Sequence, residues 1–192
     1  MVEKRKEYGI GDKPLFEKYG IGDRSLHEKY EFRNIRQDEI GQAANLERIC
    51  FPPNEACSYE NMADRIRKAP DLFLVAVDKD TGKLAGFLNG LATDRISLTD
   101  DFFTNAEVHD PEGRNIMLLG LDVLPEHRGQ GLARELMYEY LRREKEKGRV
   151  RVILTCAKEK VKMYKKFGFH DEGLGESDWG GEKWHEMSII IG

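Results

Sequence analysis

The chain has 192 residues, of which 40% are hydrophobic, and its formal net charge is -4 at pH 7. This length suits one domain with an appended segment. Lysine and arginine are scattered rather than gathered into one stripe, which argues against nucleic acid as the main partner. No apolar run approaches the roughly 20 residues of a membrane helix, and the N-terminus MVEKRKEYG lacks a signal-peptide core. We therefore expect a cytoplasmic protein without a membrane partner.

Cysteine and histidine usage argues against a metal site. The three cysteines, Cys50, Cys57 and Cys156, form no C-x-x-C pair, and the five histidines show no ligand spacing. An odd number of cysteines at such spacing also disfavours a disulfide framework. We expect no structural metal.

The N-terminus contains a short repeat with a period of eleven residues. KEYGIGDKPLF starts at Lys6, EKYGIGDRSLH at Glu17 and the fragment EKYEF at Glu28. Two copies and a fragment are too few for a solenoid, which must stack repeats to bury a face. We treat residues 1–30 as an N-terminal extension, either flexible or docked on this or a neighbouring subunit, and residues 31–192 as the folded domain.

The first part of the domain contains one strand and two helices. We expect a strand over residues 31–36 and then a helix from Glu39 that ends before Pro52. Ser58 is suited to cap a second helix that runs to about Lys68. The residues expected on the inner faces of these helices are Ile40, Ala43, Ala44, Ile49, Met62, Ile66 and Ala69.

A hairpin and a long polar stretch follow. Residues 72–77 and 84–92 are apolar runs joined by the turn DKDTGK, which indicates two paired strands. Residues 93–114 are polar apart from a few side chains such as Phe102 and Phe103. Loops of this length are usually functional or disordered.

The second half alternates strands and helices. We expect a strand over 116–123, a helix over 132–147 that ends at Gly148, and a strand over 150–155. A short helix then ends in the sequence Tyr-x-x-x-Gly-Phe at 164–169, and residues 184–191 supply the last strand. The long helix has a core-facing stripe formed by Leu132, Leu136, Met137, Tyr140 and Leu141.

The sequence LDVLPEHRGQGLA at 121–133 is a strand end, a glycine turn and a helix start. Glycines at 129 and 131 let a ligand approach the backbone, and free N–H groups and the positive end of the helix dipole face the same point. Such a point binds phosphate. The spacings of the P-loop and of the dinucleotide fingerprint are both absent.

The spacing Arg128-x-x-Gly131-x-Ala133 resembles the R/Q-x-x-G-x-G/A signature of the GNAT superfamily of N-acetyltransferases. The resemblance implies an α/β fold: a central mixed, mostly antiparallel sheet of six or seven strands, with helices on both faces and the fourth and fifth strands splayed. It also implies acetyl-coenzyme A as cosubstrate, with its pyrophosphate on the glycine loop. The coenzyme-binding positions that it implies are Leu121, Asp122, Val123, Arg128, Gly129, Gln130, Gly131, Leu132, Ala133 and Arg134.

Two chemical roles follow from the same resemblance. The backbone N–H groups of residues 121–123 would hold the pantetheine arm and polarise the thioester carbonyl. Tyr164 matches the tyrosine that protonates the departing thiolate. A phenol with a pKa near 10 loses little driving force toward a thiol with a pKa near 8.5. The alternative is that Tyr164 is an apolar anchor of its helix, with Val161 and Phe167.

Three further segments resemble the arylalkylamine and polyamine branch of the superfamily. They are FPPNEACS at 51–58, LTCAKEKVKMYKKFGF at 154–169 and WHEM at 184–187. The acceptor is then a small-molecule amine. Its site would consist of an apolar slot and two residues near the acetyl group, although aromatic residues at such places are often core. The residues implied are Phe51, Pro52, Trp184, Thr155 and Cys156.

The amine must lose a proton before it attacks. An alkylamine with a pKa near 10.4 is neutral for only about one part in a thousand at pH 7. The vertebrate members of the branch relay this proton through two histidines, whose positions hold Met117 and Leu119 here. We therefore expect ordered water, assisted by Glu55 or another carboxylate, to take the proton.

Several alternatives stay open. The acceptor could instead be a protein N-terminus, a peptide lysine or an aminoglycoside, and the chain could be a silent module that binds acyl-coenzyme A. An acetylated Cys156 intermediate is a less favoured route than direct transfer. The sequence does not fix the oligomeric state, and a homodimer is one alternative.

Overall fold

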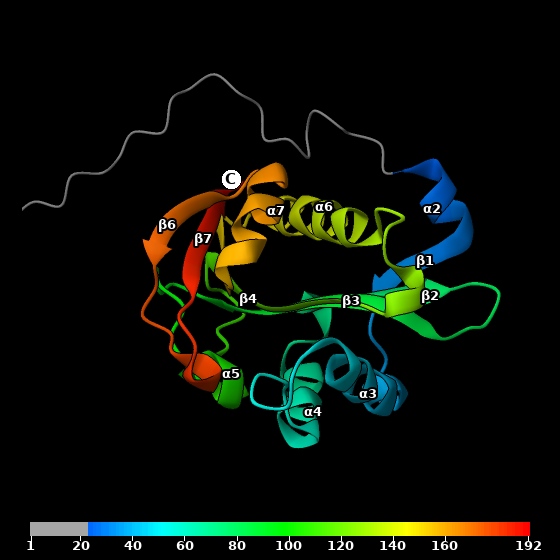
Figure 1. The fold of residues 1–192 in the computed structure, drawn as a ribbon, viewed down its shortest axis with the longest axis horizontal. Helices are drawn as coiled ribbons and strands as arrows, with labels where there is room; N and C mark the ends of the chain where they lie inside the picture. The colour runs from blue at the N-terminus through cyan, green and yellow to red at the C-terminus, as the bar shows by residue number, and fades with distance from the viewer. Residues whose placement is uncertain (1–22) are drawn as a thin grey trace, which may run out of the picture.

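A computed structural model describes residues 23–192, so the N-terminal extension 1–30 lies outside the described residues except for its last eight positions. The protein is built on a seven-stranded sheet with the order β1-β2-β3-β4-β5-β7-β6 (Figure 1). All pairs are antiparallel except β4 with β5, which confirms the expected mixed, mostly antiparallel α/β sheet. The strands are β1 Tyr30–Asn34, β2 Phe73–Asp78, β3 Leu84–Thr93, β4 Asn115–Val123, β5 Arg151–Cys156, β6 His170–Leu174 and β7 His185–Ile190.

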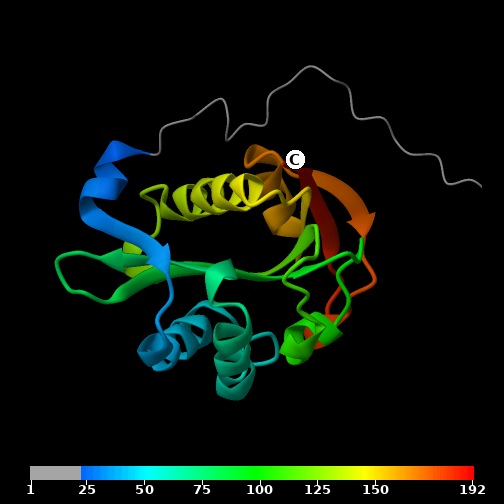
Figure 2. The ribbon, with the colours of Figure 1, turned by 180° about the vertical axis from the view of Figure 1, so that it is seen from behind.

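Helices cover both faces of the sheet, as the two opposite views show (Figures 1 and 2). The long helix α6 and the short α7 lie on one face, and α3, α4 and α5 lie on the other. One core cluster contains buried residues of α6 and α7 together with Phe102 and Phe103 of α5, and a second cluster packs α3 and α4 against the sheet. The helices are α2 Arg24–Lys29, α3 Ile40–Cys50, α4 Tyr59–Lys68, α5 Asp101–Thr104, α6 Leu132–Glu146 and α7 Val161–Lys166. None of the helices within residues 23–192 is long and apolar enough to cross a bilayer.

The start of α4 follows the expected local chemistry, whereas the inner face of α3 does not. The hydroxyl of Ser58 accepts the N–H of Asn61, so Ser58 is the N-cap of α4. The inner face of α3 differs from the expected one, because Leu46 is buried while Ile49 is 50% exposed. Because α3 lacks a clear apolar stripe, packing against the neighbouring helix and the sheet decides which of its faces is buried.

The parallel pair β4–β5 separates halfway along its length. β4 pairs with β5 only from Asn115 to Leu118, opposite 151–154. Residues 120–123 of β4 continue to pair with β3 on the other side. From Leu118 onward the two strands diverge, so a wedge opens between them and the main chain of β4 at Leu119–Val123 has no strand partner on that side.

Two segments are more ordered than the sequence indicated. The polar stretch 93–114 contains α5 and a 3-10 turn at Ala106–Val108, and Leu98 and Phe102 are fully buried. The edge strand β6 was not predicted, because its exposed and half-buried residues show no apolar alternation. Apolar side chains spaced irregularly along a loop anchor it as firmly as a periodic pattern does.

Candidate functional site

A cavity of about 600 Å³ passes through the wedge between β4 and β5. One end lies at Arg128 and Ala133, on either side of the glycine loop, and the other lies at the loop between α3 and α4. The predicted coenzyme-binding residues that do not line the cavity are Asp122, Gly129, Gln130, Gly131, Leu132 and Arg134. The predicted site residues that line it are Phe51, Pro52, Leu121, Val123, Arg128, Ala133, Thr155, Cys156, Tyr164 and Trp184. The structure thus brings together residues that are more than 130 positions apart in the chain.

The segment expected to bind the coenzyme is the turn from Gly129 to the first turn of α6. Gly131 is the N-cap of α6 with φ 90°, and Gly129 has φ 75°. Both angles lie in the left-handed region that favours glycine. Within the described residues, the backbone N–H groups of 129–134 have no protein acceptor. A Cβ on Gly129 would meet nothing within 4 Å, so a phosphate can approach this backbone.

The Arg128 side chain ties the loop to the end of β4. Its Nε donates to the carbonyl of Val123 at 2.8 Å, and one terminal nitrogen lies 3.5 Å from Sγ of Cys50 on α3. The guanidinium therefore fixes where the strand ends relative to the loop. A direct contact of Arg128 with a phosphate remains a prediction.

Asp122 differs in orientation from its two neighbours. Its carbonyl oxygen lies 2.6 Å from the place of a Cβ on Gly86, so its main chain faces β3. By strand alternation the main chain of Leu121 and Val123 faces the wedge. The Asp122 side chain is 1% exposed, and neither carboxyl oxygen has a partner within the described residues. Burial and the charge of Glu47 raise the pKa of this carboxyl well above its usual range.

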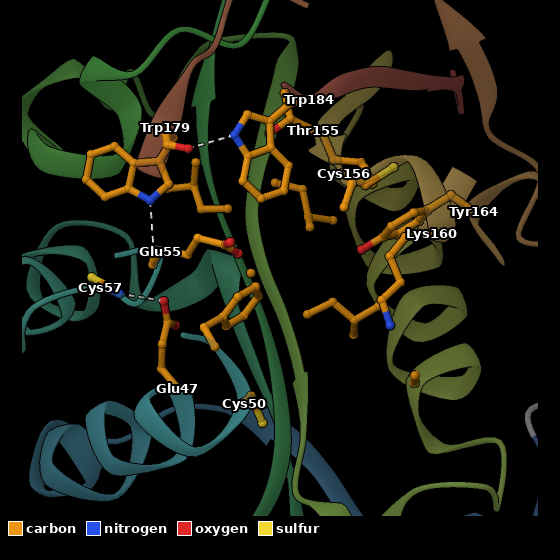
Figure 3. A pocket seen from close by; sticks show the side chains of 18 of the residues that line it. Glu47, Cys50, Glu55, Cys57, Thr155, Cys156, Lys160, Tyr164, Trp179 and Trp184 are labelled. Atoms are coloured by element: carbon orange, nitrogen blue, oxygen red, sulfur yellow. Dashed lines mark hydrogen bonds between the residues drawn. The ribbon is translucent and has the colours of Figure 1, made fainter. Parts of the chain in front are cut away.

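Tyr164 is held on α7 by aromatic neighbours. Its ring makes edge contacts with Phe167 at 6.0 Å and Phe169 at 5.8 Å. The phenol lines the cavity and its oxygen points toward the centre (Figure 3). Burial, with smaller effects from Cys156 and Asp122, raises the pKa of Tyr164, so the hydroxyl keeps its proton at neutral pH. The anchor role and the position facing the cavity are therefore compatible.

All three thiols line the cavity and all are poor nucleophiles. Burial raises the pKa of Cys156 to about 12, with smaller effects from the nearby carboxylates Asp171 and Glu159. Burial likewise raises the pKa of Cys50 to about 11 and that of Cys57 to about 11. The thiolate is the reactive form, so this environment disfavours thiol chemistry.

Hydrogen-bonded aromatic residues build the opposite end of the cavity, where the sequence predicts the acceptor site. Trp184 Nε1 donates to the carbonyl of Trp179 at 2.8 Å, and Trp179 Nε1 donates to the carbonyl of Glu55 at 2.9 Å (Figure 3). The ring of Trp179 also stacks on Phe103 at 5.1 Å. The last loop, the polar stretch and the α3–α4 loop are thereby joined into one wall.

Carboxyl groups lie along the same wall. Glu47 on α3 is 4% exposed, its Oε1 accepts the N–H of Cys57 at 2.9 Å, and its Oε2 has no partner among the described residues. Burial raises the pKa of Glu47, and the nearby Arg65 partly opposes that shift. Burial also raises the pKa of Glu55, with contributions from the charges of Glu182 and Glu159.

The positions of the missing histidines are occupied by apolar side chains. Met117 is fully buried, while Leu119 lines the cavity. Neither can take a proton. A proton acceptor must therefore come from another element or from water.

Sequence reasoning missed several residues of the cavity wall. An aromatic residue inside the glycine-rich segment GESDWGGEKW was a usable signal for Trp179. Some of the others lie within the segments 51–58 and 154–169 that resemble the family, and the rest sit in helices or loops where only tertiary contacts place them. The others are Glu47, Cys50, Cys57, Arg65, Phe103, Lys160 and Met163.

Comparisons with known proteins agree with this architecture. The loading GNATL domain of CurA from Lyngbya majuscula superimposes with a TM-score of 0.72 at 19% identity, over 84% of this chain and 98% of that chain. The GphF GNAT-like decarboxylase in complex with isobutyryl-CoA gives 0.69 at 16% identity, over 84% and 100%. The spermidine/spermine N-acetyltransferase SpeG from Vibrio cholerae gives 0.57 at 18% identity, over 86% and 95%. At these identities the likeness shows the fold alone.

No curated protein sequence matches the chain. The family model described as Acetyltransferase (GNAT) family matches residues 40–169, which is more than half of the chain and includes the glycine loop and Tyr164. Together with the splayed sheet, this match means that the chain belongs to the GNAT acetyltransferase family.

Proposed function

We propose that the protein is an N-acetyltransferase that transfers the acetyl group of acetyl-coenzyme A directly to a primary amine, of the small arylalkylamine or polyamine class. One observation carries the proposal. A single cavity runs from Arg128 and Ala133, which flank the glycine loop, along the unpaired edge of β4 to the aromatic wall, with the Tyr164 hydroxyl between the two ends. Donor, acid and acceptor sites are therefore within reach of one another.

The glycine loop would hold the diphosphate of the coenzyme, since its N–H groups are free and its backbone is open to a ligand. The coenzyme supplies an activated thioester. Main-chain groups of Leu121 and Val123 would orient it and stabilise the oxyanion that develops on its carbonyl. As the new C–N bond forms and the C–S bond breaks, Tyr164 would give its proton to the departing sulfur.

For the proton of the amine, Glu47 is better supported than Glu55. Both line the cavity and both have a raised pKa, which brings a carboxylate closer to the basicity that a proton acceptor needs near neutral pH. Only Glu47 presents a buried oxygen that lacks a protein partner among the described residues. A water between that oxygen and the amine would complete the route.

Negative charge at the acceptor end favours a cationic substrate. Burial is the main cause of the raised pKa of Glu55, and the negative charges of Glu182 and Glu159 add to it. A group of carboxylates beside an aromatic slot suits an amine that carries an aromatic ring or a second cationic group. This charge pattern supports a free amine over a neutral acceptor.

A panel of amines with detection of released thiol tests the proposal. We expect turnover of arylalkylamines or polyamines that saturates with acetyl-coenzyme A. Activity confined to peptides or aminoglycosides would show that the proposed acceptor class is wrong, while the proposed acetyltransferase activity would stand. Coenzyme binding in calorimetry without turnover of any amine would instead indicate a silent acyl-coenzyme A-binding module. The decarboxylase among the structural neighbours shares only 16% identity, too little to transfer its reaction.

A further inference from the structure

The segment Asp23–Tyr30 lies outside residues 40–169, which match the family model, yet it packs against the glycine loop. Helix α2 sits beside the end of α6 where that helix begins, and both views of the ribbon agree on this placement (Figures 1 and 2). The segment therefore contacts the coenzyme end of the site from its outer side.

Three polar contacts join the segment to the loop and to α6. The backbone N–H of Asp23 donates to Oε2 of Glu135 at 3.1 Å, and Nε2 of His27 donates to Oε1 of the same carboxylate at 2.7 Å. The ammonium of Lys29 donates to Oε1 of Gln130 at 2.9 Å. The Glu135 side chain is only 5% exposed, whereas the His27 side chain is 41% exposed, so the carboxylate is buried and the imidazole covers it from the solvent side.

Two buried side chains complete the contact. Leu26 is 4% exposed, and its Cδ1 lies 3.9 Å from the place of a Cβ on Gly131. Tyr30 is 1% exposed, and its hydroxyl is hydrogen-bonded to Nδ1 of His127 at 2.8 Å. The turn that leads into α6 thus has a packed support behind it.

The segment is itself fixed to the sheet. The ammonium of Lys79, in the turn after β2, donates to the carbonyl of His27 at 2.7 Å. The backbone N–H of Lys79 donates to the carbonyl of Lys29 at 3.1 Å. The turn after β2 therefore holds Asp23–Tyr30 in place, and Asp23–Tyr30 in turn packs against the glycine loop.

The charge of Glu135 affects how an anionic ligand can bind at the start of α6. Glu135 lies in the first turn of α6, where a coenzyme diphosphate would bind, and two anions at one helix N-terminus repel each other. Both carboxylate oxygens of Glu135 are taken up by donors from the segment. The loop N–H groups then remain free for a second anion.

We propose that Asp23–Tyr30 is a positioning segment for the coenzyme. It holds the glycine loop and the first turn of α6 in the form that binds a diphosphate, and it compensates the charge of Glu135. The inference rests on the proposed coenzyme site and adds to it a part that the family match does not include.

The repeat also identifies which of its copies is suited to this position. The upstream copy has Asp12, Leu15, Lys18 and Tyr19 where the docked copy has Asp23, Leu26, Lys29 and Tyr30. At the position of His27 the upstream copy has Phe16. A phenyl ring would leave a buried oxygen of Glu135 without its donor, so the histidine specifies the downstream copy.

The experiment compares His27→Phe and Leu26→Ala with the control Arg24→Ala in the full chain. Arg24 lies on the same helix, its side chain is 92% exposed and its ion pair is with Glu28 alone. Calorimetry measures the Kd of coenzyme A, steady-state kinetics gives KM for each substrate, and melting gives Tm. Because a less populated binding form weakens apparent affinity, we expect coenzyme binding about fivefold to tenfold weaker in both variants. The amine KM and the control should stay within about twofold of wild type.

A conservative substitution at His27 tests whether its hydrogen bond to Glu135, rather than the size of its side chain, is what matters. His27→Gln keeps an N–H donor and should bind coenzyme within about twofold of wild type. Unchanged coenzyme affinity in His27→Phe would overturn the inference, as would an equal rise of both KM values that follows Tm. If wild-type protein binds coenzyme but acetylates no amine, the proposed function is wrong. The role of Asp23–Tyr30 would still be testable, because calorimetry measures coenzyme affinity without turnover.

Discussion

The two ends of the cavity are built in opposite ways. The coenzyme end comes from one continuous stretch, Leu121–Ala133, and offers mainly backbone N–H groups. The acceptor end combines side chains from α3, α4, the polar stretch and the last loop, such as Glu47, Arg65, Phe103 and Trp179. A site made of backbone depends on local conformation, whereas a site made of side chains depends on which elements the fold brings together.

This contrast predicts different mutational responses. Changes at the coenzyme end should act through backbone conformation and affect KM for acetyl-coenzyme A. Changes at the acceptor end should act through individual side-chain contacts and affect KM for the amine. Tyr164 stands between the two ends and should affect kcat.

The largest effect is expected from Tyr164→Phe. The phenyl ring keeps the edge contacts with Phe167 and Phe169 but has no proton to give. We expect kcat to fall about a hundredfold or more, with coenzyme affinity unchanged. Stopped assays for acetylated product give kcat, and calorimetry gives the affinity. If Tyr164→Phe keeps full turnover, Tyr164 is not the acid and serves only to pack α7 against its neighbours.

Glu47→Gln should lower kcat/KM about tenfold near neutral pH, with Glu55→Gln as the matched control. The raised pKa of Glu47 means that the base is present above that pKa and is lost as pH falls through it. The variant should lack this acid limb and should converge with wild type near the pKa of the amine. A loss that is equal at every pH contradicts the role, and a larger loss in Glu55→Gln assigns it to Glu55.

Gly131→Ala should weaken coenzyme binding about tenfold, because a Cβ at φ 90° costs about 1–2 kcal/mol that the loop would relieve by moving. Gly148→Ala is the matched control. It has φ 84° at the other end of α6, with open space around its Cβ. Both variants should lower Tm, but only the first should raise KM for acetyl-coenzyme A. Equal kinetics in the two would mean that the loop geometry is irrelevant to binding.

Trp179→Phe should raise the amine KM about threefold to tenfold, the effect of one lost hydrogen bond. It removes the donor to the carbonyl of Glu55 and keeps an aromatic ring against Phe103. Tyr59→Phe on the exposed face of α4 is the control. Initial rates at saturating acetyl-coenzyme A measure the effect. A shift in coenzyme KM instead would remove the distinction between the two ends.

Cys156→Ala should change kcat less than about twofold. With a pKa of about 12, only about one part in 100,000 of this thiol is ionised at pH 7, which disfavours an acetyl-cysteine route. Mass spectrometry under turnover should find no acetylated Cys156. Loss of activity in both the Ala and the Ser variants would restore the covalent route.

Most of the elements could be predicted from the sequence because their signals are local. The N-cap at Ser58, the glycine at 148 after α6 and the continuous apolar runs of β2 and β3 each act within a few residues. The orientation of α3 and the edge strand β6 could not be predicted, because tertiary packing decides them. The role of residues 23–30 was left open for the same reason, since a helix of six residues is stable only where it packs.

By itself, then, the sequence determined the glycine turn, the order of the strands and helices apart from α2, α5 and β6, and the resemblance to the GNAT acetyltransferases. Only the tertiary structure decided that β4 and β5 part after Leu118, that Glu47 and Trp179 share one wall, and that Asp23–Tyr30 supports the glycine loop. The physical reason is the distance along the chain between the interacting residues. Backbone conformation is set by neighbours in the chain, whereas burial, charge coupling and hydrogen bonds between side chains depend on segments that meet only after folding.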